Sequence, residues 1–227
     1  MNVASTQLRR ETEAALLELA ERFQLITSDT AICLRPELFR NGTEAGSLLS
    51  QMAATELLQE ITLYGDVPCF VPPRRNRQRT LSETTRIRAL AMLHVCASHS
   101  RSRRRLTASE FSKYFPELKR PGLPMNYYVD LSQDQPKLGF LRVDTGGHGR
   151  WDRVVSKALD DMRKHRLEPA FARFIKRNAL EIRVVTALPQ KADRICRALT
   201  DKSTSLTRSI QVSVVPELLN LIAPVSA

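Results

Sequence analysis

The sequence predicts an α+β protein with more than one compact part. The chain has 227 residues, whereas single domains usually run to about 100 to 200 residues. Helical periodicity dominates the first half, and short β-branched runs alternate with helical ones after residue 126. Hydrophobic residues make up 42% of the chain and charged residues 26%, so it can bury a core and is not disordered throughout.

The first 72 residues contain three helical patterns followed by a hairpin pattern. The helical patterns and the two extended segments after them cover Gln7–Leu25, Thr30–Leu34, Thr43–Glu60, Ile61–Tyr64 and Pro68–Val71. Three helices followed by a hairpin is the order of a winged helix, which we assign to residues 1–72. In that fold the third helix normally enters the major groove of DNA.

The third helix of this chain is unusual for a DNA-reading element. Its sequence, TEAGSLLSQMAATELLQEI, has three glutamates and no basic residue. Such a helix is poorly suited to approach phosphates. A docking or dimerising winged helix therefore competes with a DNA-reading one.

Residues 73–122 are predicted to form a basic helical connector. Residues 72–120 hold 13 basic and 3 acidic side chains, whereas residues 1–71 hold 5 and 10. The arginines fall into two clusters, first Arg74, Arg75, Arg77 and Arg79, then Arg101, Arg103, Arg104 and Arg105. A helix begins after Ser82, and Thr107 with Glu110 has the spacing of a capping box that opens a short helix. The second cluster is therefore expected in a loop between two helices.

Both arginine clusters are predicted to contact phosphates. Each arginine that neutralises a phosphate releases condensed counterions, so a basic band is typical of a nucleic-acid contact. We expect the two clusters to converge as one surface that contacts double-stranded DNA. The alternative is a solvated basic surface with no ligand.

Residues 123–227 are predicted to form an α/β domain with a mixed sheet. The segment begins with a hairpin pattern and continues with helices and β-branched strands. The expected elements are strands at Tyr127–Leu131 and Leu138–Val143, helices at Trp151–Met162 and Glu168–Asn178, a strand at Ile182–Leu188, a helix at Pro189–Thr200 and a strand at Ile210–Val215. Because a helical crossover returns the chain parallel to the preceding strand, the sheet should be mixed and flanked by helices.

This order of hairpin, helix, strand, helix and strand is similar to the core of the PD-(D/E)XK nuclease superfamily. With the winged helix before it, the chain resembles the plasmid replication-relaxation proteins of bacterial mobile elements. The most specific piece is FLRVDTGG followed by a helix with Lys157. The resemblance implies catalytic roles for Asp130, Asp144 and Lys157, with Mg²⁺ as cofactor. Arg142 stands where the family pattern has glutamate, which places a positive charge beside the cation site.

The same residues also have a purely structural interpretation. Asp130 and Asp144 can terminate strands and accept turn hydrogen bonds, and Lys157 can lie on a solvated helix face. We favour this interpretation for catalysis, because a motif transfers function only when its ligand set is intact.

The function predicted from the sequence is that of a DNA-binding protein of a bacterial mobile element, without catalysis and without a cofactor. The alternatives are a divalent-metal-dependent endonuclease and a module for protein interaction or homodimerisation. No spacing of cysteines and histidines indicates a metal site, and TGGHGR lacks the spacing of a nucleotide-binding loop. The absence of a long apolar run and of a secretory signal pattern predicts a cytoplasmic protein with no membrane partner.

Overall fold

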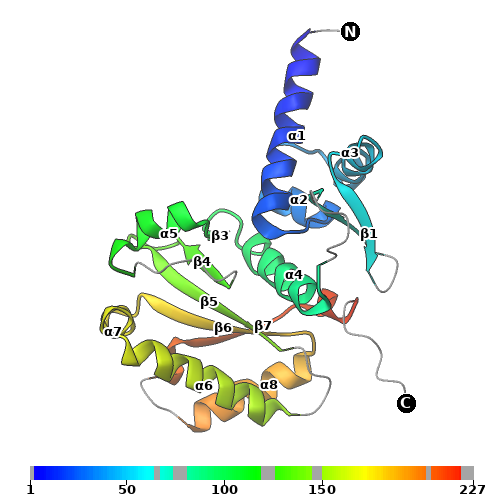
Figure 1. The fold of residues 1–227 in the computed structure, drawn as a ribbon. Helices are drawn as coiled ribbons and strands as arrows, with labels where there is room; N and C mark the ends of the chain where they lie inside the picture. Colours follow the sequence, from blue (N-terminus) through cyan, green and yellow to red (C-terminus); the bar gives the residue numbers. More distant parts are fainter. Residues whose placement is uncertain are drawn as a thin grey trace, which may run out of the picture. The chain divides into compact units, whose positions relative to one another are not determined.

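The computed structural model describes residues 3–63, 67–73, 81–118, 126–144, 150–202 and 206–220. The chain is α+β, as expected, and divides into two compact units, Met1–Ser100 and Arg101–Ala227. Figure 1 shows the elements of both units. No helix in the described ranges is long and apolar enough to cross a membrane.

The first unit contains the predicted three helices and hairpin, together with a fourth helix. Its elements are α1 (Val3–Phe23), α2 (Ser28–Leu34), α3 (Gly42–Ala54), β1 (Gln59–Leu63), β2 (Val67–Val71) and α4 (Glu83–Ala97). The strands β1 and β2 pair antiparallel, and Ile26 forms a bridge with Phe70 of β2. Buried apolar side chains from α1, α3, β2 and α4 fill the unit, among them Leu16, Phe23, Met52, Phe70 and Leu90.

Two boundaries in the first unit differ from the sequence prediction. The third helix was expected to reach Glu60 but ends at Ala54, because Glu56 adopts a left-handed backbone conformation with φ of 60°. The helix α4, which the sequence placed in a connector, packs against α1 and α2. Arg74, Arg75, Arg77 and Arg79, the first predicted arginine cluster, lie outside the described residues.

The second unit is built on one five-stranded mixed sheet in the order β3-β4-β5-β6-β7. Its elements are β3 (Arg103–Arg105), α5 (Ala108–Tyr114), β4 (Tyr127–Asp130), β5 (Lys137–Val143), α6 (Trp151–Leu167), α7 (Pro169–Lys176), β6 (Leu180–Thr186), α8 (Pro189–Asp201) and β7 (Ile210–Val214). The strand β4 runs antiparallel to β3 and β5, whereas β5, β6 and β7 are parallel. The predicted mixed sheet is confirmed, and so is the capping box of Thr107 and Glu110 at the start of α5.

The two faces of this sheet have different character because side chains alternate along each strand. One face is apolar and lies under α6, α7 and α8 (Figure 1). There Leu138, Ile182 and Val184 pack with helix residues such as Met162 and Ile195. The other face has polar side chains in the middle of the strands. They include Tyr128, Lys137, Glu181, Arg183 and Ser213.

The four cysteines differ in solvent exposure, and this difference predicts how fast each thiol reacts. Cys33 and Cys196 are exposed, whereas Cys69 and Cys96 are buried. Burial raises the pKa of Cys69 to about 12, and burial together with the charge of Asp193 raises the pKa of Cys196. At pH 8 we expect a thiol reagent to modify Cys33 first and Cys196 more slowly, because the thiolate is the nucleophile.

Ellman titration of the native and the urea-unfolded protein measures these rates. Cys33→Ser and Cys196→Ser should each remove one of the two accessible thiols. A third thiol that reacts at the same rate in the native protein would contradict the burial of Cys69 and Cys96.

Candidate functional site

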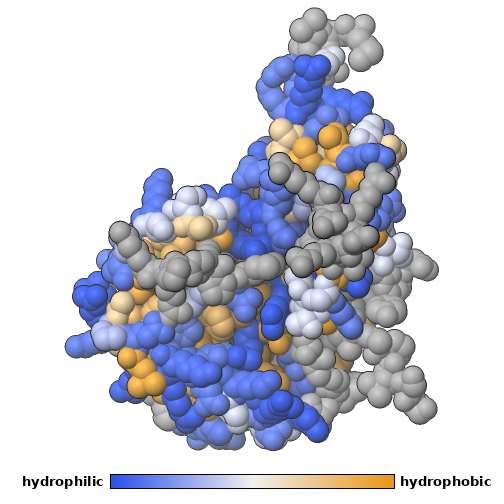
Figure 2. All heavy atoms as spheres, viewed as in Figure 1, coloured by the Kyte–Doolittle hydropathy of each residue, from blue (hydrophilic) through white to orange (hydrophobic). Residues whose placement is uncertain are grey.

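The net positive charge of the chain belongs entirely to the second unit. Arg101–Ala227 contains 24 basic and 13 acidic side chains, whereas Met1–Ser100 contains 11 of each. The net charge of +11 is therefore that of the second unit alone. Hydrophilic residues cover the surface around α6 in the view of Figure 2. A ligand that is held by positive charge is thus expected on this unit.

A pocket of about 330 Å³ lies at the carboxyl end of β5, beside the first turns of α6 and α8. The carboxyl ends of parallel strands are the usual ligand sites of open α/β sheets. Five of the side chains that line the pocket are basic and one is acidic. The lining consists of Arg142, Val143, Asp144, Arg150, Arg153, Val154, Lys157 and Lys191.

Two ion pairs balance the charge in the inner part of the pocket. Lys191 is only 3% exposed, and its Nζ lies 2.7 Å from Oδ2 of Asp144. Thr186 Oγ1 donates a hydrogen bond of 3.2 Å to the same carboxylate oxygen. Arg142 forms an ion pair with Asp161 of α6. These contacts hold Asp144, Lys191 and Arg142 in place, and with Asp161 included the two pairs have no net charge.

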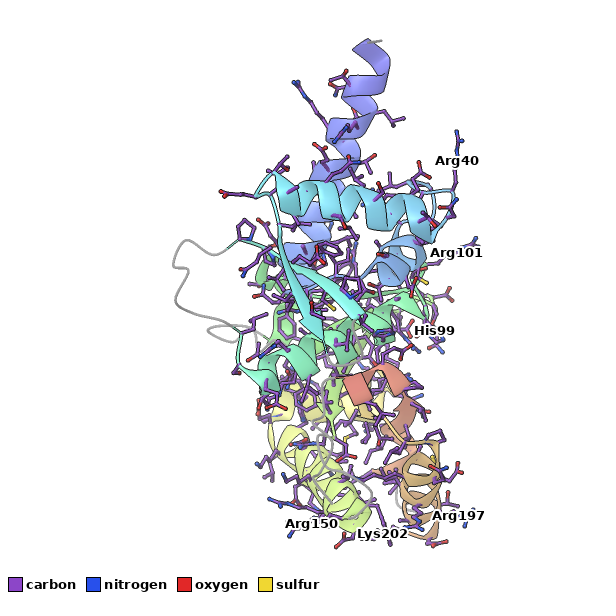
Figure 3. All side chains as sticks on the ribbon, turned by 90° about the vertical axis from the view of Figure 1, so that its right-hand side faces the viewer. Arg40, His99, Arg101, Arg150, Arg197 and Lys202 are labelled. Atoms are coloured by element: carbon purple, nitrogen blue, oxygen red, sulfur yellow. The ribbon has the colours of Figure 1, made fainter. Side chains whose placement is uncertain are left out.

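The outer part of the pocket has three further cations, Arg150, Arg153 and Lys157. They are exposed and stand three and four residues apart, which places them on one face of the start of α6. None of them forms an ion pair within the described part of the chain. Figure 3 shows Arg150 at the N-terminal end of α6. This part of the pocket therefore has an uncompensated positive charge.

Both helices that border the pocket begin there without a side-chain cap. Arg150, the residue before α6, has a left-handed φ of 59° and makes no capping hydrogen bond. The helix α8 begins with Pro189 and has no side-chain cap either. The first N–H groups of a helix and its dipole favour an anion at this position. The electrostatics of the pocket thus suit a negatively charged group.

The structure does not bring together the three residues that the resemblance assigned to a catalytic site. Asp130 pairs in register with Lys137 at the start of β5, whereas Asp144 follows the end of β5. Seven residues of extended chain separate these positions by about 23 Å. Only Asp144 and Lys157 share the pocket. No group of three or more His, Cys, Asp or Glu side chains that suits a metal ion occurs in the described ranges.

Asp130 is engaged in a structural contact instead. Arg103 Nε donates a hydrogen bond of 2.6 Å to its carboxylate, and the backbone N–H of Ser132 donates one of 2.9 Å. Burial by itself raises the pKa of Asp130, but the hydrogen bonds from Ser132 and Arg103 outweigh it and hold that pKa below its ordinary value. The carboxylate stays charged and is held by these two contacts.

The second arginine cluster is also placed differently from the prediction. Arg103, Arg104 and Arg105 form strand β3, not a loop between two helices, because this segment pairs with β4. Arg103 binds Asp130, whereas Arg104 points to the other face and lies 5.2 Å from the ring centre of Tyr114. Arg101, two residues before the strand, is exposed. The cluster therefore does not form the single phosphate-facing surface that the sequence suggested.

A buried polar network on the opposite face of the sheet was missed in the sequence. Glu181 accepts hydrogen bonds from Tyr128 and Arg183, and Lys137 Nζ lies 3.2 Å from its second oxygen. Arg183 also donates to Tyr128 and to Ser213. The alternating charges of LEIRVVT are the only local signal of it. Because each polar group has a partner, the network is a structural feature of the sheet.

Comparisons with protein-family models, with curated proteins and with solved structures found no match to this chain.

Proposed function

We propose that the chain is a DNA-binding protein that contacts the phosphate backbone through its second unit and does not cut it. The observation that supports this most is the basic pocket, in which Arg150, Arg153 and Lys157 have no acidic partner among the described residues. They belong to the unit with all of the net charge. An unpaired cation binds a phosphate more favourably than an ion-paired one does, because no internal ion pair has to break first.

The arrangement of the carboxylates argues against cleavage. A metal-dependent nuclease needs two or more oxygen ligands near one cation. Asp130 is held by Arg103 and Asp144 by Lys191, and the two lie at opposite ends of β5. A cation at either position would have to displace an ion-paired basic side chain. Binding without catalysis is therefore the better proposal for this unit.

The arrangement of helices and strands bears on the function of each unit. The order of α1, α2, α3 and the β1–β2 hairpin supports a winged helix, and the five-stranded mixed sheet supports a nuclease-like core. The helix α3 has one acidic and no basic side chain, so we place the main DNA contact on the second unit. The resemblance to plasmid replication-relaxation proteins suggests a role in a bacterial mobile element.

Fluorescence anisotropy with a duplex DNA between 50 and 200 mM salt tests the proposal. The triple variant Arg150→Asn, Arg153→Ala and Lys157→Ala removes the three outer cations, with asparagine chosen because it tolerates the left-handed φ. Each phosphate contact contributes about 0.9 to the slope of log K against log salt, so the slope should become shallower by about 2 to 3. The affinity at 50 mM salt should fall at least tenfold.

The control removes three exposed arginines from the neutral first unit, with Arg9, Arg10 and Arg40 replaced by alanine. It loses the same net charge and should keep the slope of the wild type. Equal slopes for both triple variants, or no binding of DNA by the wild type at low salt, would refute the proposal. Supercoiled plasmid with Mg²⁺ should stay intact, and nicking that Asp144→Ala abolishes would reinstate an endonuclease.

A further inference from the structure

The pocket at the start of α6 has features that a continuous phosphate backbone does not require. Its inner part is charge-balanced and rigid, with Lys191 buried against Asp144. Its outer part has three cations from a single face of α6 that converge on one small volume. Because the three cations line one small pocket, they can act together on a single phosphate group.

The charge of the pocket suits a group with two negative charges. A phosphate monoester has a charge of about −1.5 to −2 at pH 7, whereas an internal phosphodiester has one negative charge. Arg150, Arg153 and Lys157 together exceed what one diester neutralises. The uncapped first turn of α6 adds backbone N–H donors beside these cations. A terminal phosphate therefore matches the pocket better than an internal one.

The size of the pocket leads to the same conclusion. Small-molecule sites usually occupy about 300 to 1,000 Å³, and this pocket, at about 330 Å³, is near the lower limit. It accommodates a phosphate with its sugar. An internal phosphate has a sugar on both sides, whereas a terminal phosphate is attached on one side only and can enter a recess.

We propose that this pocket binds a phosphate monoester at the end of a nucleic-acid chain. The proposal rests on the DNA-binding function proposed above and specifies which phosphate the pocket takes. Arg153 and Lys157 contact the phosphate oxygens from α6. Lys191 is a positioning residue, which keeps Asp144 neutralised at the inner wall.

The test compares two duplexes of identical sequence, one with phosphates at its 5′ and 3′ ends and one with hydroxyl groups at all ends, by anisotropy at constant salt. We expect the phosphorylated duplex to bind about tenfold more tightly, because one further negative charge meets several cations at close range. Arg153→Ala and Lys157→Ala should each reduce this ratio towards one. Arg197→Ala removes an exposed cation from α8 that does not line the pocket (Figure 3), and it should keep the ratio of the wild type.

Three outcomes would overturn the inference, and each leads to a different conclusion about the protein. Equal affinity for both duplexes would refute end recognition and leave the DNA-binding function standing. No binding of either duplex would refute the proposed function itself. A deoxynucleoside 5′-monophosphate that competes as strongly as the phosphorylated duplex would make the pocket a small-molecule site. Weak competition by the mononucleotide, together with a preference for the phosphorylated duplex, is the supporting result.

Discussion

Replacing Glu181 with alanine is expected to lower the free energy of unfolding of the second unit by about 3 to 5 kcal/mol. Its carboxylate is almost fully buried, and it is the acceptor for Tyr128, Arg183 and Lys137. Without it two cations face each other across the middle of the sheet with no anion between them. Removing one partner of a buried ion pair costs this much because the remaining charge is neither solvated nor neutralised.

The effect should depend on pH in a defined direction. Burial by itself raises the pKa of Glu181, but the charge of Arg183 and the hydrogen bonds from Tyr128 and Arg183 outweigh it, so the pKa lies below its ordinary value of 4.5. A lowered pKa in the folded state means that the contribution of Glu181 is complete above pH 4.5 and is lost as the pH falls below the folded value. The difference between the wild type and Glu181→Gln should therefore shrink in acid.

Urea unfolding followed by the fluorescence of Trp151 measures this directly. Trp151 is the only tryptophan and lies at the start of α6, so its signal reports on the second unit. Asp134→Asn is the control, because Asp134 is exposed in the same unit, and it should change the free energy by less than about 0.5 kcal/mol. A loss below about 1 kcal/mol for Glu181→Ala would mean that the network contributes little.

Replacing Gly139 with alanine should destabilise the second unit by about 2 to 3 kcal/mol, although only one methyl group is added. Gly139 lies directly opposite Tyr128 in the antiparallel pair of β4 and β5. A Cβ at residue 139 would overlap the ring of Tyr128. The ring has no free space to move into, because it is fully buried and its hydroxyl is bound by Glu181 and Arg183.

A double-mutant cycle separates this steric effect from a general loss of backbone freedom. In a Tyr128→Leu background the ring is absent, so Gly139→Ala should cost clearly less than in the wild type. Gly42→Ala serves as the control, since the nearest atoms to a Cβ there are at ordinary contact distances of 3.6 and 3.7 Å. It should be neutral or slightly stabilising at the start of α3 by circular dichroism. Equal costs in both backgrounds would refute the contact with Tyr128.

Local sequence patterns predicted most of the second unit correctly. The order of its strands and helices after residue 126, the mixed sheet and the capping box at Thr107 follow from periodicity and capping, which depend on neighbours within one or two turns. The same patterns identified the three helices and the hairpin of the first unit. The end of α3 was missed, because Glu56 fits a helical pattern and its left-handed φ has no local signal.

The sequence by itself determined the elements, their order and the excess of positive charge. Only the tertiary structure decided which charges remain available to a ligand. Pairing across 27 residues neutralises Arg103 with Asp130, and the sheet register places Asp130 far from Asp144. The physical reason is that helices and strands form from short-range preferences, whereas ion pairing depends on the distance between side chains after the sheet has formed. Arg150, Arg153 and Lys157 remain available because the fold brings no described acidic side chain within ion-pair distance of them.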